Sequence, residues 1–409
     1  MRKTFQRIFL FACLFILNFA TTLLLYTYMK NIFISISTIA LVAVSLSCGG
    51  KGTSAYSSAG DTLHFKYAEH ITMVRHDGYT EVSLSNPWKP GAELHRYLLV
   101  PRADSARMLN LPQGTVVYTP VQRAVVSTAP HCWLLDELGA ANAISGVCDL
   151  PYINMMSVHQ AVRSGKFVDC GNSMSPSVEH IVSLGAQAIL VSPFDGVAYG
   201  QLDHIGVPLI ECAEYMETSA LGRAEWMKFY GALVGKEKSA DSLFEEVERN
   251  YIEWSQMARA SKVKPRVITE RVVSGTWYCP GGKSSMGKLI ADAGGNYVFA
   301  DDGHSGSLSL SPEKVIDKAA NANRWLFVGG GKEMLTPSQL LAEYKGYGLL
   351  RAFKEGQVYE CLPSMRNPYF EESSFRPDFL LIDFVRIFHP ELTSGTATHY
   401  YICIDNRVE

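Results

Sequence analysis

Two glycine-containing runs carry residue types that could bind phosphate or act as a nucleophile. The run 281–284 reads Gly-Gly-Lys-Ser, which is how a phosphate-binding loop ends, but such a loop needs a glycine five residues before Gly282, where Trp277 stands. The run 282–287 holds a serine between glycines, with one residue too many for a nucleophile elbow. The first run does not have the spacing of a phosphate-binding loop, and the second does not have that of a nucleophile elbow. We therefore do not expect an enzyme.

Potential metal ligands are scattered along the chain. The histidines form neither an HExxH motif nor a close pair, and the cysteines form no CxxC pair. This argues against zinc ribbons, iron–sulfur sites and other protein-built metal cages, so we expect no metal site and no cofactor. One alternative stays open, a zinc- or manganese-binding protein in which His131, His204 and His304 share one coordination sphere.

Aromatic and charged side chains gather in segments that we expect to be loops after strands. Rings at loop tips, where no core would bury them, suggest contact with a large flat or apolar ligand, and arginines could meet anionic groups. An equally simple interpretation is that some of these rings only stabilise the conformation of their own loops. The candidate ligand-binding residues are His131, Trp133, Phe194, Asp195, Tyr199, Arg271, Trp277, Tyr278, Tyr369, Phe370 and Arg376.

The elements that position these loops alternate between strand and helix from Arg123 onward. Apolar runs such as 188–191 and 325–328 are typical of buried strands, and continuous apolar strands between helices predict a mostly parallel sheet covered on both faces. Ligands of such sheets bind beyond the carboxyl ends of the strands, which is where the candidate loops lie.

The same order of elements occurs twice, on either side of residues 218–260. Ser175-Pro176 and Ser311-Pro312 are each predicted to open a helix that leads into an apolar strand. Between these halves, apolar residues with helical spacing predict long helices interrupted at Gly235. The sequence therefore predicts an α/β fold of two lobes with mostly parallel sheets, joined by a long helical backbone.

The N-terminal part is predicted to be a lipoprotein signal. A basic start at Met29, a short apolar run and small residues lead to Cys48, so the interpretation is that translation begins at Met29 and Cys48 is lipidated. Alternatively, residues 8–28 form a membrane helix. The expected organisation is a signal region (1–48), a tether (49–61), an accessory antiparallel β segment (62–119), an N-terminal lobe (120–217), central helices (218–262) and a C-terminal lobe (263–392).

The order of these segments resembles a known family. The chain resembles the solute-binding proteins of bacterial ABC importers for cobalamin, ferric siderophores and haem. The segments that carry the resemblance are the lipoprotein signal, the strand from Arg123, residues 175–184 and 188–191, the helices containing 229–236, and residues 289–296. The resemblance covers about residues 120–390. It implies a stiff two-lobe protein with a shallow cleft for a bulky chelate.

The resemblance also implies partners. One acidic residue on each lobe would dock onto arginines of an ABC permease dimer with its ATPase, and the matching positions are Glu179 and Glu313. The leading hypothesis is a binding protein on the bacterial cell envelope, facing the periplasm and held to the membrane by its lipid anchor. The rival is a metal-chelatase-like enzyme on a related fold. The net charge of −3 gives no electrostatic case for nucleic acid.

Overall fold

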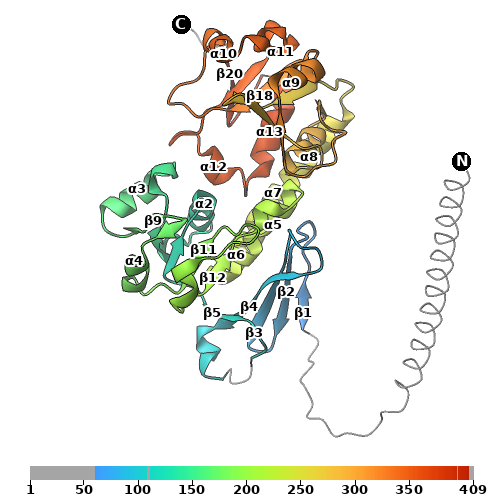
Figure 1. Cartoon of the computed structure of the whole chain (residues 1–409). Helices are drawn as coiled ribbons and strands as arrows, with labels where there is room; N and C mark the ends of the chain where they lie inside the picture. The colour runs from blue at the N-terminus through green and yellow to red at the C-terminus, as the bar shows by residue number, and fades with distance from the viewer. Residues whose placement is uncertain (1–59, 108–110, 394, 405–409) are drawn as a thin grey trace, which may run out of the picture. The chain divides into compact units, whose positions relative to one another are not determined.

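A computed structural model describes residues 60–107, 111–393 and 395–404 (Figure 1). The predicted signal region with Cys48 and residues 49–59 of the predicted tether lie outside the described residues, whereas Asp61, the last residue of that tether, already belongs to a strand. Within the described ranges, none of the helices combines the length and the apolar composition needed to cross a bilayer.

The accessory segment forms a sheet in which each strand pairs with the next. Strands β2 and β3 form a hairpin across Asp77-Gly78, in which only Gly78 has a positive φ, so the turn is not of type I′. The last strand runs parallel to its neighbour because the chain crosses over before it, and the expectation of a purely antiparallel sheet is wrong there. The strands are β1 Asp61–Leu63, β2 Ile71–His76, β3 Tyr79–Ser85, β4 Glu93–Pro101 and β5 Thr115–Thr119, with the crossover in η1 Arg102–Arg107.

The first lobe contains a wholly parallel sheet with the strand order β12-β11-β6-β7-β8. The apolar run Ala188–Val191 forms β11 and is buried along its whole length, as the sequence predicts. The other strands are β6 Ala124–Val126, β7 Ile144–Val147, β8 Val168–Asp169 and β12 Leu209–Glu211, and the helices are α2 Ala129–Glu137, α3 Met156–Arg163 and α4 Val178–Ser183.

The start of α4 differs from the prediction by two residues. Ser175–Pro176 is the short strand β10, paired with β9 Gly171–Asn172, and does not open the helix. Ser177 is the N-cap instead, and its hydroxyl accepts a hydrogen bond from the backbone N–H of His180.

The central helices are α5 Ala220–Glu225, α6 Met227–Val234 and α7 Glu237–Ala260 (Figure 1). Gly235 ends α6 in the left-handed conformation, as its place in the pattern predicts. Phe244, Val247 and Tyr251 form the buried stripe of α7, which packs on α6 and on the C-terminal helix α13 Pro377–Phe388.

The second lobe contains a sheet with the strand order β16-β13-β18-β19-β20. Its last strand, β20, lies beyond the predicted end of the C-terminal lobe at residue 392 and pairs antiparallel with β19. The strands are β13 Arg266–Thr269, β16 Asn296–Tyr297, β18 Arg324–Val328, β19 Val358–Cys361 and β20 Tyr401–Cys403. The helices are α8 Ser285–Asp292, α9 Pro312–Ala319, α10 Pro337–Glu343, α11 Arg351–Lys354 and α12 Tyr369–Glu372.

A small antiparallel sheet in the second lobe replaces the loop expected around Trp277. Its strands are β14 Val272–Val273, β15 Thr276–Pro280 and β17 Ser307–Leu310. The Trp277 side chain is fully buried and packs against the rings of Trp325 and Tyr347, and its Nε1–H donates to the Thr269 carbonyl oxygen at 3.0 Å. The prediction that Trp277 lies at a loop tip is wrong because β15 alternates its side chains between the core and solvent.

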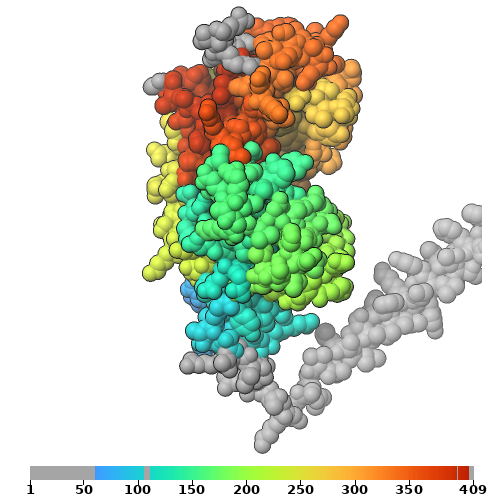
Figure 2. Space-filling model, turned by 90° about the vertical axis from the view of Figure 1, so that its left-hand side faces the viewer, coloured from blue at the N-terminus to red at the C-terminus, as the bar shows by residue number. Residues whose placement is uncertain are grey.

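The segment around α12 packs against the first lobe. Helix α12 contacts α2, and the backbone N–H of Asn154 donates to the Glu371 carboxylate at 2.6 Å. Figure 2 shows the red C-terminal segment lying against the green segment of the first lobe. Phe375 is fully buried here, with its ring edge-on to His131 and Tyr230.

We expect Trp277→Ala to destabilise the protein by about 3–5 kcal/mol, because it removes a fully buried indole from the core. The adjacent Tyr278 is 46% exposed and serves as the control, so Tyr278→Ala is expected to cost less than about 1 kcal/mol. Urea unfolding of both variants measures the difference. Equal effects of the two substitutions would contradict the described packing.

Candidate functional site

A pocket of about 260 Å³ lies in the first lobe, where β6, β7 and β11 end. The three strands are parallel, so their carboxyl ends meet at one edge of the sheet, the usual ligand-binding edge of such folds. The pocket is lined by Ser127, Thr128, Asp149, Ser173, Met174, Pro176, Val191, Ser192, Phe194, Val197, Ala198, Tyr199 and Leu202.

The pocket lining combines hydroxyl groups with apolar side chains and one carboxyl group, that of Asp149. None of these lining residues is a lysine, arginine or histidine. Such a surface can donate and accept hydrogen bonds and can pack on apolar faces, but it offers no cation to an anionic ligand. It therefore favours an uncharged or cationic ligand group.

Two acidic residues with left-handed backbone follow strands, one in each lobe. Asp149 lies past the end of β7 with φ of 53°, and Glu270 directly follows β13 with φ of 63°. This conformation is costly for residues other than glycine and is enriched at binding and catalytic sites. Both residues were missed by sequence reasoning, since nothing in the local sequence reports φ.

Glu270 also has a perturbed ionisation. Burial raises the pKa of its carboxyl group to about 7. A hydrogen bond from the Val328 backbone and the positive charge of Arg271 both lower this pKa, but by less than burial raises it. A raised pKa at the carboxyl end of a strand in the second lobe makes Glu270 a candidate site residue.

The structure brings together some of the residues predicted in the first lobe. Phe194 and Tyr199 both line the pocket, and Asp195 is exposed in the loop between them. The Tyr199 hydroxyl donates to Glu211 at 3.1 Å, and this hydrogen bond holds the Tyr199 side chain in its place in the pocket lining. Trp133 lies half-buried in α2 and does not line the pocket.

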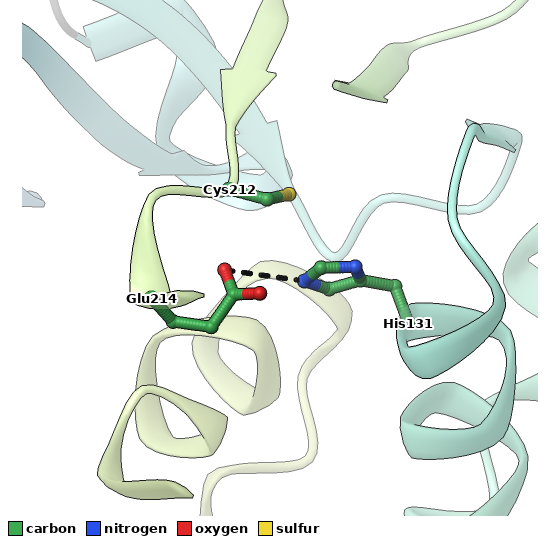
Figure 3. A group of neighbouring side chains, drawn as sticks. All are labelled: His131, Cys212 and Glu214. Carbon is green, nitrogen blue, oxygen red and sulfur yellow. Dashed lines mark ion pairs between the residues drawn. The ribbon is translucent and has the colours of Figure 1, made fainter. Parts of the chain in front are cut away.

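His131 lies under the pocket, in a buried cluster with Cys212 and Glu214 (Figure 3). It is 1% exposed, so the prediction that it reaches a ligand from a loop tip is wrong: the first turn of α2 places it in the core. Thr128, which lines the pocket, is hydrogen-bonded to His131 Nδ1. His131 Nε2 lies 3.6 Å from Glu214 Oε2.

This cluster is the one group of three possible metal ligands found among the described residues. His204 and His304 are exposed and do not belong to it, so the alternative of a three-histidine coordination sphere is wrong. Burial would raise the pKa of the Glu214 carboxyl group, but the His131, Arg223 and Tyr230 side chains together lower it to about 2.

Several residues predicted in the second lobe have structural partners instead. Arg376 is 6% exposed and forms ion pairs with Asp378 at 2.7 Å and Glu246 at 2.9 Å, and its contact with a ligand stays a prediction. Arg271 pairs with Glu343 at 2.9 Å.

The aromatic residues predicted to contact a ligand in the second lobe divide into buried and exposed side chains. Tyr369 is buried at 7% exposure, like Trp277, whereas Tyr278 and Phe370 are 46% and 52% exposed. Contact between either exposed ring and a ligand remains a proposal. Tyr369 is held in the core by edge-on packing against Tyr400 and Tyr401.

The two glutamates predicted to dock onto a permease have similar surroundings. Glu179 lies in the first turn of α4 and Glu313 in the first turn of α9, and both are exposed. Each could also be an ordinary first-turn acid favoured by the helix dipole.

Comparison with known proteins identifies related sequences. The model of the periplasmic binding protein family matches residues 124–364. An uncharacterized lipoprotein of Methanocaldococcus jannaschii is 26% identical over 298 residues, which cover 70% of each chain. A second uncharacterized lipoprotein of that organism is 26% identical over 352 residues, which cover 82% of this chain and 86% of the relative.

Solved structures share the fold. A periplasmic heme binding protein from Pseudomonas aeruginosa has a TM-score of 0.55 and 16% identity, covering 70% of this chain and 99% of that one. A possible iron-binding (periplasmic solute-binding) protein from Staphylococcus epidermidis has a TM-score of 0.52 and 19% identity, covering 66% and 100%. At these identities the likeness concerns the fold.

The raised pKa of Glu270 predicts a pH dependence of stability. The folded state keeps this carboxyl group protonated up to about pH 7, whereas the unfolded chain ionises near its ordinary pKa of 4.5. Stability therefore falls as the pH rises through this window. Glu270→Gln should remove the effect and be more stable than the parent at pH 8 by about 1–3 kcal/mol, with little difference at pH 4.

Urea unfolding at the two pH values measures this difference, with the exposed Glu137→Gln as the control. A stability difference between Glu270→Gln and the parent that is the same at both pH values would contradict the assignment.

Proposed function

This chain belongs to the periplasmic binding protein family, and we propose that it is the lipid-anchored substrate-binding component of an ABC importer that captures a metal chelate. The pocket at the carboxyl edge of the first sheet carries this proposal. Its volume of about 260 Å³ matches part of a bulky chelate, and the rest of the ligand would extend toward the second lobe.

The charges of the side chains that line the pocket allow the candidate ligands to be ranked by preference. Ferric siderophores, haem and cobalamin all fit a shallow aromatic and polar site, but catecholate siderophores and the haem propionates carry negative charge. The pocket offers Asp149 and hydroxyl groups without a lysine or arginine among its lining residues. We therefore propose a chelate with little negative charge, such as a ferric hydroxamate or a corrinoid, as the preferred cargo.

The envelope location follows from the proposed lipidation of Cys48. The two related chains from Methanocaldococcus jannaschii are named lipoproteins, which supports an anchor of the same kind here. Loaded protein would dock onto a permease dimer through Glu179 and Glu313, one exposed carboxylate from each lobe. The permease and its ATPase then move the cargo, and the binding protein leaves it chemically unchanged.

Titration of the purified chain with a ferric hydroxamate, cobalamin, haem and a ferric catecholate, followed by tryptophan fluorescence, tests the cargo. We expect the first two to bind more tightly than the last two. Phe194→Ala removes an aromatic wall of the pocket and should weaken binding roughly 5- to 30-fold. The control is Tyr152→Ala, an exposed aromatic outside the pocket.

Absence of binding to all four compounds would refute the proposal. Equal affinities of the Phe194→Ala and Tyr152→Ala variants would show that the chelate binds elsewhere.

Charge reversal tests the docking residues. Glu179→Arg and Glu313→Arg should each lower ligand-stimulated ATP hydrolysis by the permease–ATPase complex in proteoliposomes roughly tenfold or more, since each places like charges against permease arginines. Chelate affinity should not change, and Glu137→Arg, an exposed reversal on α2, should behave as the parent. Full stimulation by the double variant would exclude these two positions.

A further inference from the structure

Three potential metal ligands converge in the core of the first lobe from different segments of the chain. His131 lies in the first turn of α2, Cys212 directly follows β12, and Glu214 begins the 3₁₀ helix η5 Glu214–Met216. They are 1%, 0% and 3% exposed, and their ligand atoms all lie within 4.8 Å of one another (Figure 3). Such enclosure distinguishes the cluster from acidic groups at a surface.

The histidine is oriented as a metal ligand usually is. Its Nδ1 is hydrogen-bonded to Thr128, whereas its buried Nε2 has no hydrogen-bond partner and points into the cluster. When Nδ1–H donates to the threonine oxygen, Nε2 keeps its lone pair for a cation. A buried polar atom without a hydrogen bond is costly and calls for an explanation, which the Glu214 carboxylate oxygen 3.6 Å away does not give for a neutral imidazole.

Glu214 also has a supporting hydrogen bond, whereas the hydrogen bond of the Cys212 thiol would be released when the metal replaces its proton. The Tyr230 hydroxyl donates to Glu214 Oε2 at 2.7 Å, and the Cys212 thiol donates to the Ile210 carbonyl oxygen at 3.4 Å. Phe375 closes the side facing the second lobe, with its ring centroid 5.7 Å from that of His131. His131 and Glu214 therefore have the supporting hydrogen bonds usual for metal ligands, and the whole cluster is buried.

We propose that His131, Cys212 and Glu214 bind one divalent transition-metal ion, with Zn²⁺ as the best fit, at a site separate from the transported cargo, and that they supply three of its four tetrahedral ligands. Imidazole nitrogen, thiolate sulfur and carboxylate oxygen are the ligand types that Zn²⁺ uses. A neutral histidine, a thiolate and a carboxylate together cancel the two positive charges, so the buried complex carries no net charge.

Binding changes the protonation and the geometry of the cluster. The Cys212 thiol releases its proton to solvent as the metal–sulfur bond forms, so affinity falls with decreasing pH. An ion about 2.0–2.3 Å from each ligand atom draws the side chains together by roughly 1 Å. Because Thr128 contacts both His131 and the pocket, the ion would stiffen the floor of the ligand pocket.

Cobalt substitution tests this site. The full chain is expressed in cobalt-supplemented minimal medium, purified, and examined by elemental analysis and absorption spectroscopy. We expect one cobalt ion per chain and a thiolate-to-cobalt charge-transfer band in the near ultraviolet. Cys212→Ser should abolish the band and weaken Zn²⁺ binding at least ~100-fold, whereas Cys170→Ser, another buried thiol, should change neither.

A second variant keeps the test decisive if Cys212→Ser does not fold. Tyr230→Phe removes only the hydroxyl that supports Glu214, so it should keep the charge-transfer band and weaken Zn²⁺ binding roughly 10- to 100-fold in a competition with a chromophoric chelator. No bound metal in the parent chain would overturn the proposal and leave a buried ion pair alone. A band that persists in Cys212→Ser, or unchanged affinity in Tyr230→Phe, would also overturn it. The outcome is independent of whether the pocket binds a chelate.

Discussion

An ionic network between α7 and α13, with Arg376 and Asp378 buried and Glu246 partly exposed, is the contact on which the arrangement of the two lobes depends. Arg376 joins Asp378 at the start of α13 to Glu246 on α7, and Asn250 of α7 donates to Asp378 at 3.0 Å. Asp378 is fully buried, so loss of its partners would leave a charge without compensation, which is strongly destabilising. This network holds the second lobe on the central helix while Phe375 packs against the first lobe.

The sequence was sufficient to predict the elements whose pattern is continuous. The buried run Ala188–Val191 and the apolar stripe of α7 follow directly from hydrophobic periodicity, and so does the two-lobe order. Trp277 was misplaced although a signal existed: Trp277 and Cys279 are buried while Tyr278 between them is exposed, which is the alternation of a strand. The glycines around this run made it resemble a loop.

The site was harder to predict because its residues meet only in the folded chain. Phe194 and Tyr199, which line the pocket, could be predicted to lie near it because both follow a recognisable strand. The partners of Arg376 come from a distant helix, and the left-handed backbone of Asp149 and Glu270 leaves no trace in residue type. His131, Cys212 and Glu214 have no local motif, so spacing rules for metal sites could not detect them.

The central claim is that a chelate occupies the carboxyl edge of the first sheet. Hydrogen–deuterium exchange of the full chain, with and without a saturating ferric hydroxamate, tests it most directly because it locates the ligand without a substitution. We predict slower exchange of the backbone amides after β6, β7 and β11, in residues 127–128, 149 and 192–199. Unchanged exchange there, with protection confined to the accessory sheet or to the far ends of the strands, would contradict the account.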